Sequence, residues 1–350
     1  MDSNKHIIKD NIIAREALQA LDNLPDSVRR TLFVVDERNQ LVGSLTDGDI
    51  RRGLLAGMEI SHPITDFIRR DCKFLLEGKE NLQEIKRYRK EDIFLLPLVN
   101  ADHVLLSVVN LQQTRTILPI SAILMAGGRG ERLRPLTDNT PKPMLKIGGK
   151  PIIEINIDRL ISFGVKDIFI SVRYMKEQIM EYFGDGSSKG VSIKYIEETD
   201  PLGTLGCLSL VESFKQDNLL VMNSDLLTNI DFEDFYDYFK TSKADMTLAS
   251  IPYKVNIPYA VIDTNKEEVK AFKEKPTYTY YSNGGIYLMK AALQRTMKTG
   301  AHFNATDMMD MVIADGLMTL KHYPLLDYWL DIGKHQDFLK AQEDIKRIHF

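Results

Sequence analysis

The stretch ISAILMAGGRGERLRPLTDNTPKPM, residues 120–144, joins an apolar run to a turn rich in glycine and arginine. The apolar run predicts a buried strand. Three glycines follow it, at Gly127, Gly128 and Gly130. Without a Cβ, their backbone N–H groups can closely approach phosphate oxygens, and Arg132 and Lys142 add fixed positive charge. The stretch therefore predicts a phosphate-binding loop, although a glycine-rich turn with solvated arginines has the same local pattern.

Two common nucleotide-binding motifs do not fit this loop. The sequence lacks the GxxxxGK[ST] pattern of a P-loop, and GGRGER lacks the GxGxxG spacing of a dinucleotide-binding fold. The loop is therefore expected to belong to another nucleotide-binding class.

The chain after the loop alternates between predicted strands and helices. Residues 151–164 predict a helix with an apolar face that ends at Gly164. Strands are expected at ISAILMAG, KDIFISV, SIKYIEE, NLLVMNSD, MTLAS and YSNGGIYLM. This order predicts an α/β fold with a Rossmann-like, mostly parallel sheet. Ligands in such sheets bind beyond the C-terminal strand ends, which is where Gly127 lies.

Composition limits the partners of the protein. The 350 residues have a formal net charge of −4 and are 44% hydrophobic, which gives no overall reason to bind nucleic acid or a membrane surface. A secretory signal and a membrane-spanning run are not evident, so a cytoplasmic location is expected. Cys72 and Cys207 are too few for a disulfide framework or a thiolate metal site.

The first 115 residues contain a weak internal repeat. Residues 14–24 predict a helix, and residues 31–55 predict two strands joined by a turn and then a second helix. About sixty residues later, residues 80–92 and 93–114 repeat this order. We therefore expect a duplicated α+β domain at 1–115, a linker at 116–120 and an α/β domain at 121–350.

The α/β part resembles the sugar-1-phosphate nucleotidyltransferases. AILMAGGRGERLRPLTDNTPKPMLKIGGKPIIE is similar to their N-terminal motif, and the likeness continues in order through YIEETDPLGTLGCL, LVMNSDLL, FKEKP, SNGGIYLM and YWLDIGKHQDFLKA. Members of this family, including guanylyltransferases that act on mannose or hexosamine 1-phosphates, join a sugar 1-phosphate to a nucleoside triphosphate and release pyrophosphate. The resemblance implies the same reaction here.

The resemblance also implies roles for individual residues. It implies catalytic roles for Arg132 and Lys142, and Mg²⁺ ligands at Asp225 and Asp331. The implied nucleotide-binding residues are Ala126, Gly127, Gly128, Gly130, Glu198, Gly203 and Thr204. The implied residues for the sugar phosphate are Glu274, Lys275, Asn283 and Gly284. Ala260 stands where the family usually has glycine, so the sugar is left open.

The choice of base follows from hydrogen-bond chemistry. The resemblance aligns Glu198 with the family's base-edge residue; guanine presents two donors on its Watson–Crick edge, and a carboxylate there can accept both. GTP is therefore the favoured donor, while Glu197 is the alternative if the alignment shifts by one residue. A thymidylyl-, uridylyl- or cytidylyltransferase is the alternative activity.

The N-terminal repeat resembles a pair of cystathionine-β-synthase-type (CBS) domains. Its first copy has the GxxTxxD element at Gly43, Thr46 and Asp49, which implies that Thr46 and Asp49 bind a regulatory nucleotide. The second copy has Val109 and Gln112 instead, so one site is expected to be lost. Such modules often pair, so a homodimer or higher homo-oligomer is expected. A nucleotide sensor with an inactive transferase domain is the competing interpretation.

Overall fold

The chain divides into two compact units. The computed structural model describes residues 3–25, 30–79 and 81–348. Unit 1 comprises Met1–Leu118 and unit 2 comprises Pro119–Phe350. The boundary falls inside the expected linker, and Ile117 packs in a hydrophobic cluster of unit 1. Glu80, the first residue of one expected helix, lies outside the described residues.

Unit 1 contains two copies of one small sheet. The first copy comprises β1 (Ile7–Lys9), α1 (Ala14–Asp22), β2 (Thr31–Val35), β3 (Leu41–Thr46) and α2 (Asp47–Leu55). The second comprises β4 (Leu75–Leu76), α3 (Leu82–Lys90), β5 (Leu95–Val99) and β6 (Leu105–Asn110). In each sheet the first two strands are parallel and the last two are antiparallel. The repeat expected from the sequence is therefore present in the backbone.

The two copies agree even in their turns. Asp36 Oδ1 accepts hydrogen bonds from the backbone N–H groups two and four residues later, and Asn100 Oδ1 does the same in the second copy. Each hairpin also has one register shift, at Val34/Val35 and Leu98/Val99. The copies differ after their last strand, because β6 is followed by a turn within the described residues where β3 is followed by α2.

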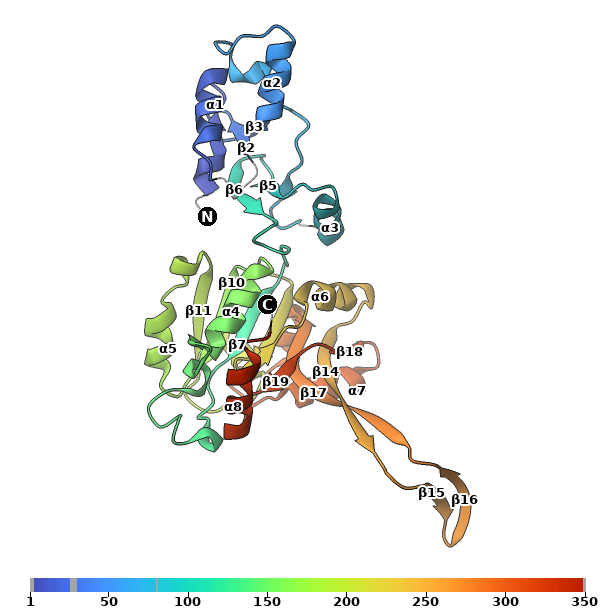
Figure 1. Cartoon of the computed structure of the whole chain (residues 1–350). Coiled ribbons are helices and arrows are strands. Elements are labelled where there is room, and N and C mark those ends of the chain that lie inside the picture. Colours follow the sequence, from blue (N-terminus) through green and yellow to red (C-terminus); the bar gives the residue numbers. More distant parts are fainter. Residues whose placement is uncertain (1–2, 26–29, 80, 349–350) are drawn as a thin grey trace. The chain divides into compact units, whose positions relative to one another are not determined.

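Unit 2 is built on a seven-stranded sheet in the order β11-β10-β7-β12-β17-β14-β18 (Figure 1). Its strands are β7 (Ser121–Met125), β10 (Asp167–Val172), β11 (Ser192–Glu197), β12 (Asn218–Asn223), β14 (Met246–Asn256), β17 (Thr277–Lys290) and β18 (Leu320–Pro324). β17 runs antiparallel to both neighbours, and every other pair is parallel. The sheet is therefore mixed, with the expected parallel part on one side of β17.

Helices cover the sheet on both faces. They are α4 (Ile152–Ser162), α5 (Lys176–Phe183), α6 (Phe232–Thr241), α7 (Ala305–Asp315) and α8 (His335–Asp344). Ile123 packs in a cluster with Met308 and Val312 of α7, while its neighbours Ala122 and Leu124 are also fully buried. Because successive residues of a strand face opposite sides of the sheet, a strand that is buried along its length must have packed elements on both faces.

Short strands complete unit 2. They form three two-stranded ladders, which pair β8 (Lys146–Ile147) with β9 (Lys150–Pro151), β13 (Leu226–Thr228) with β19 (Trp329–Asp331), and β15 (Val261–Asn265) with β16 (Glu268–Lys273). The β13–β19 pair matters for the site, since it places Leu226 opposite Asp331. None of the described helices is long and apolar enough to cross a membrane.

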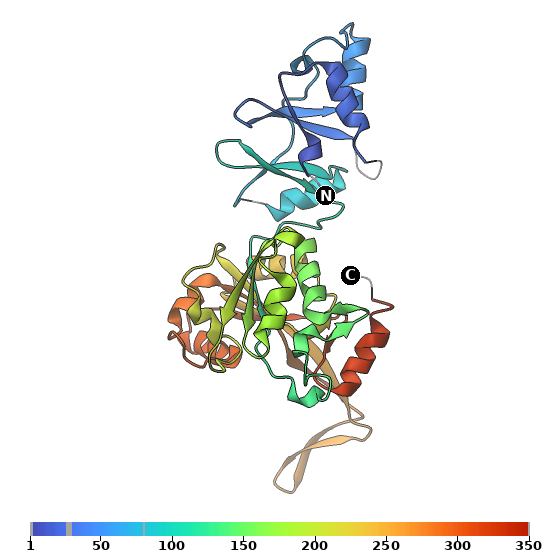
Figure 2. The same cartoon turned by 90° about the vertical axis from the view of Figure 1, so that its left-hand side faces the viewer.

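A long two-stranded arm leaves the sheet. We define the arm as residues 250–283, which comprise the outer parts of β14 and β17 with the β15–β16 hairpin at the tip. Figure 1 and the perpendicular view in Figure 2 both show it projecting clear of the sheet. The sequence pattern predicted strands at its base but not this extension.

Candidate active site

The glycine loop lies at the C-terminal edge of the sheet. The register pairs Met125 at the end of β7 with Asn223 at the end of β12 and with Ser171 in β10. The residues that follow these parallel strands therefore emerge at one edge, because parallel strands end on the same side. Loop residue Ala126 is buried, and its N–H donates to the Ser171 carbonyl at 2.9 Å.

Each glycine of the loop has a different environment. A Cβ on Gly128 would meet no atom within 4 Å, so its backbone faces open space. A Cβ on Gly127 would lie 3.4 Å from Glu198 Oε1. Gly130 has a φ of +64°, and a Cβ there would lie 2.9 Å from the Cβ of Lys142. The turn therefore leaves backbone accessible at Gly128 and brings Lys142 against Gly130.

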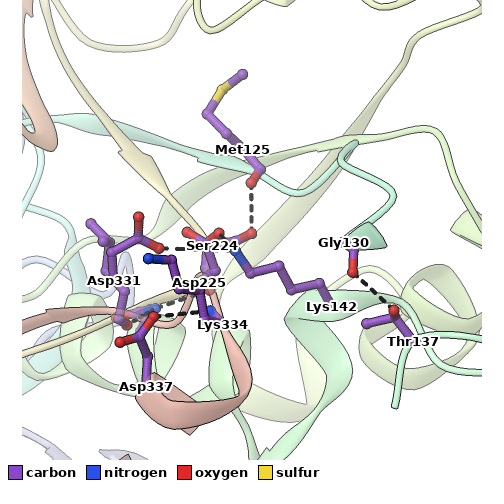
Figure 3. A network of polar contacts seen from close by, with 11 residues as sticks. Met125, Gly130, Thr137, Lys142, Ser224, Asp225, Asp331, Lys334 and Asp337 are labelled. Carbon is purple, nitrogen blue, oxygen red and sulfur yellow. Dashed lines mark hydrogen bonds and ion pairs between the residues drawn. The ribbon is translucent and has the colours of Figure 1, made fainter. Parts of the chain in front are cut away.

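Two carboxylates and one ammonium group meet beside this loop (Figure 3). Lys142 Nζ donates a hydrogen bond to Asp225 Oδ2 and lies 3.9 Å from Asp331 Oδ1. The Lys142 side chain is only 12% exposed, so water screens these charges weakly. Lys142 follows the loop, Asp225 follows β12, and Asp331 ends β19. Three distant segments thus form one charged cluster.

Arg132 also acts on Asp331. Its guanidinium lies beside Gly333, two residues after Asp331, since a Cβ on Gly333 would be 3.6 Å from Arg132 Nη2. The positive charges of Lys142 and Arg132 both act to lower the pKa of Asp331. Burial and the negative charge of Asp225 outweigh them, so the pKa of Asp331 is raised above its ordinary value. Burial is the largest cause, so it is mainly the loss of solvation that disfavours the charged form of Asp331.

The carboxylate pair fits a divalent cation that also contacts phosphate. Asp225 and Asp331 each have one buried oxygen, Oδ1, without a hydrogen-bond partner among the described residues. Mg²⁺ prefers oxygen ligands and is commonly held by one or two carboxylates plus substrate phosphates. Groups of three or more metal-ligating side chains are not found in the part of the chain that the structure describes, so phosphate and water would complete the shell.

Buried polar groups fix the position of Asp225. Ser224 precedes it, and the Ser224 hydroxyl donates to the Met125 carbonyl at 2.6 Å. Asn156 in α4 is also buried and donates to the carbonyls of Ser224 and Leu226 at 3.3 Å and 2.9 Å. The sequence analysis missed Asn156, although an amide between Ile155 and Ile157 was a visible signal. Both residues tie the Asp225 loop to its surroundings.

Glu198, and not Glu197, faces the glycine loop. Glu198 accepts hydrogen bonds from the Ser171 hydroxyl and from Leu202 N–H, the latter at 3.1 Å. Glu197 is exposed and pairs with Lys176 instead. Ser171, which the sequence analysis did not single out, therefore orients the carboxylate. A carboxylate has about four acceptor positions, so Glu198 retains capacity for a ligand.

A free, buried thiol lies close to this carboxylate. Burial, with a smaller contribution from the charge of Glu198, raises the pKa of Cys207 to about 12. The thiol is therefore protonated at neutral pH and adds no charge beside Glu198.

Gly203 and Thr204 lie in the turn after Glu198. Gly203 has a φ of +79°, and a Cβ there would lie 2.7 Å from Asn304 Oδ1 and 2.8 Å from the Phe303 carbonyl. Thr204 is half-buried beside it. A side chain at position 203 would collide with Asn304 and Phe303, which explains the glycine. The hydrogen bond from Leu202 N–H to the Glu198 carboxylate closes the turn.

Asn283 and Gly284 lie at the base of the arm. Asn283 Nδ2 donates to the Tyr287 hydroxyl, and its Oδ1 accepts from Gly285 N–H, both at 2.9 Å. The Gly284 carbonyl accepts from Trp329 Nε1 at 2.9 Å. Trp329 was not identified from the sequence, yet it joins this segment to the strand that ends at Asp331.

Glu274 and Lys275 are not brought together with the charged cluster. Both are exposed and lie between β16 and β17, far out on the arm (Figures 1 and 2). Lys275 has a φ of +42°, which is unusual for a residue with a side chain.

In unit 1, Thr46 and Asp49 share a network at the start of α2. Thr46 caps the helix, and the buried Asp49 carboxylate accepts from Thr46 and forms ion pairs with Arg52 and Arg69. A cavity of about 350 Å³ is lined by Thr46, Arg69 and Lys73, together with residues from both copies of the repeat. Asp49 does not belong to this lining, so its carboxylate holds arginines instead of facing the cavity.

A glycine loop, two cations and two carboxylates thus lie at the C-terminal edge of an α/β sheet, the edge at which such sheets bind their ligands. Residues 121–348 match the model of the nucleotidyl transferase family, and the chain belongs to that family.

Several curated relatives and solved structures are similar to unit 2. A mannose-1-phosphate guanylyltransferase of Mycobacterium tuberculosis is 30% identical over 233 residues, which cover 65% of each chain. A D-glycero-alpha-D-manno-heptose 1-phosphate guanylyltransferase of Aneurinibacillus thermoaerophilus is 32% identical over 65% of this chain and 99% of its own length. A Bacillus anthracis structure assigned as a glucose-1-phosphate thymidylyltransferase has a TM-score of 0.54 at 24% identity, covering 66% of this chain and 97% of its own, and it shows the common fold.

Proposed function

We propose that unit 2 transfers GMP from GTP to a sugar 1-phosphate. A phosphate oxygen of the sugar 1-phosphate attacks the α-phosphorus, the bond to the β-phosphate oxygen breaks, and pyrophosphate leaves as the GDP-sugar forms. The observation that carries this proposal is the cluster of Lys142, Asp225 and Asp331 beside an accessible glycine turn. Mannose 1-phosphate and a heptose 1-phosphate are the first acceptors to test, since they are named in the relatives.

The residues of the chain supply positioning and charge. Backbone N–H groups at Gly127 and Gly128 contact the triphosphate, while Lys142 and Arg132 balance charge on the phosphates. Mg²⁺ held by Asp225 and Asp331 would supply the additional positive charge that the crowded phosphate oxygens need. Ser171 and Leu202 hold the Glu198 carboxylate beside the glycine loop, where it would accept the N1–H and N2–H donors of guanine, and this favours GTP over the other triphosphates.

The experiment is a pyrophosphate-release assay. The full chain is incubated with Mg²⁺, each of GTP, ATP, UTP, CTP and dTTP, and a panel of sugar 1-phosphates. Release with GTP and one sugar phosphate supports the proposal. Pyrophosphate release only with another nucleotide would show that the base is not guanine. No release with any combination would contradict the proposed transferase activity.

For unit 1 we propose a CBS-type pair that binds a regulatory nucleotide. The cavity has the size of a small-molecule site, and Thr46, Arg69 and Lys73 offer hydrogen-bonding and cationic groups for phosphate or ribose. Asp49 would act by holding Arg69, whose Nε lies 3.1 Å from its carboxylate. A thermal-shift panel of adenine and guanine nucleotides tests this, because a ligand that prefers the folded state raises the melting temperature. The shift should be lost in Arg69→Ala and unchanged in Arg30→Ala, a surface arginine outside the cavity lining.

A further inference from the structure

Arg173 is the first residue after β10, the strand that lies between β11 and β7 in the sheet. The register of β10 with β11 ends at Val172 and Glu197. The next hydrogen bond, from Glu198 N–H to the Val172 carbonyl at 3.0 Å, continues this ladder. Neighbouring strands lie about 4.8 Å apart, and register partners share a face of the sheet. Arg173 and Glu198 are therefore neighbours at the C-terminal edge of the sheet.

Gly127 lies against both of these residues. A Cβ on Gly127 would lie 3.5 Å from the Cβ of Arg173 and 3.4 Å from Glu198 Oε1. Because glycine has no side chain, the space between the arginine and the carboxylate stays open at this point. A ligand that approaches the glycine loop here meets a positive side chain and a negative one.

Arg173 and Glu198 keep their charged groups available. The Glu198 carboxylate is half-buried and accepts from two neutral donors, the Ser171 hydroxyl and Leu202 N–H. Arg173 is also half-buried, and within residues 3–25, 30–79 and 81–348 its guanidinium has neither a hydrogen-bond partner nor an ion-pair partner. Opposite charges on neighbouring strands normally attract each other. Here Ser171 and Leu202 bind the carboxylate instead, so both charged groups retain hydrogen-bonding capacity for a ligand.

Guanine matches this pair of side chains. Its Watson–Crick edge carries the O6 acceptor beside the N1–H and N2–H donors, and arginine is a common partner of guanine O6 and N7. A guanidinium has only donors and a carboxylate only acceptors, so each group fits one part of that edge. Adenine and cytosine place an amino donor where guanine has O6. Uracil and thymine place an acceptor where guanine has N2–H.

We propose that Arg173 is a specificity-determining residue of the nucleotide site, which donates to guanine O6 while Glu198 accepts from N1–H and N2–H. The proposal deepens the proposed transferase function and rests on it for the identity of the nucleotide. Arg173 sets donor against donor when adenine or cytosine enters, whereas Glu198 sets acceptor against acceptor when uracil or thymine enters. Because Lys142 and Arg132 serve the phosphates, loss of Arg173 should alter the selection of the base.

Equilibrium binding of guanine analogues tests this contact without turnover. GTP, 6-thio-GTP and ITP are titrated by calorimetry into the full chain without a sugar phosphate, in an Arg69→Ala background that removes the nucleotide site proposed in unit 1. 6-Thio-GTP has a weakly accepting sulfur in place of O6, and ITP lacks the N2 amino group. The parent protein should bind 6-thio-GTP roughly tenfold more weakly than GTP. Arg173→Ala should bind these two nucleotides within about twofold of each other and still discriminate against ITP.

Two further variants serve as controls for charge and folding. Lys176→Ala removes a nearby cation that pairs with Glu197, and it should keep the full discrimination between GTP and 6-thio-GTP. Arg173→Lys keeps a cationic donor and should retain part of that discrimination. Circular dichroism checks the fold of each variant.

The outcomes separate this proposal from the transferase activity. If Arg173→Ala weakens GTP and 6-thio-GTP equally, Arg173 contacts phosphate or ribose and the proposal is overturned. Equal affinity of the parent protein for the two nucleotides, or no affinity for GTP, overturns it as well. The expected binding pattern without pyrophosphate release would support the role of Arg173 and contradict the transferase function alone.

Discussion

Lys142 Nζ is hydrogen-bonded to Asp225 and lies 3.9 Å from Asp331, so a single ammonium group spans both carboxylates of the site. Lys142 comes after the glycine loop in the chain, Asp225 follows β12, and Asp331 ends β19, which belongs to a different sheet. In the proposed reaction, these three groups determine how phosphate charge is balanced.

Asp225→Asn should abolish nucleotidyl transfer and leave the fold intact. The substitution keeps the shape of the side chain but removes the charge that Lys142 and a cation require. We expect at least a ~100-fold loss in kcat, comparable to the loss of one key electrostatic group in other enzymes. The measurement is pyrophosphate release together with circular dichroism. Asp231→Asn, which alters the cap of α6, is the matched control and should retain activity. Undiminished turnover in Asp225→Asn would rule out the metal role.

Asp331→Asn should stabilise the metal-free protein while inactivating it. Burial and the charge of Asp225 raise the pKa of Asp331 in the folded state, so its protonated form favours folding and that contribution is lost as pH rises through the raised pKa. The variant should therefore melt at a higher temperature than wild type at neutral pH in EDTA. The difference should shrink as pH falls toward about 3.9, the ordinary aspartate pKa. A variant that melts lower than wild type at neutral pH would contradict this sign.

Glu198→Gln should weaken the preference for GTP. The glutamine side chain has a single acceptor oxygen, so one of the two guanine donors loses its partner. The Ser171 hydroxyl or Leu202 N–H would also compete with guanine for that oxygen. Removing one hydrogen bond to a charged group costs about 1.5–3 kcal/mol, or roughly 10- to 150-fold in kcat/KM for GTP. Glu197→Gln is the matched control, because Glu197 is exposed and pairs with Lys176. Equal effects of the two substitutions would place the base elsewhere.

Asn156→Ala should lower both stability and turnover. It leaves the Ser224 and Leu226 carbonyls without their buried donor, which costs about 1–3 kcal/mol. Because these carbonyls flank Asp225, we expect a loss in kcat with a raised Mg²⁺ requirement. Chemical denaturation and Mg²⁺ titration of activity measure the two effects. A variant with lower stability but an unchanged Mg²⁺ requirement would limit Asn156 to a structural role.

The local sequence predicted the elements and the loop. Apolar runs marked β7, β10, β11 and β12 at the expected places, and the repeat in the sequence matches the duplicated hairpins with their turns at Asp36 and Asn100. These features depend only on residues that are close together in the chain. The signals are alternation along a strand, glycine in a turn, and a side chain that caps a loop. The family resemblance then assigned roles to residues that local patterns alone left open.

Only the tertiary structure decided which of those residues meet. The choice of Glu198 over Glu197 depends on which side of β11 faces Ser171, and the convergence of Lys142, Asp225 and Asp331 depends on pairings between distant segments. The antiparallel β17 and the arm that carries Lys275 likewise follow from long-range register. A one-residue shift in register reverses the face on which every side chain lies, and no neighbouring residue in the sequence records that shift.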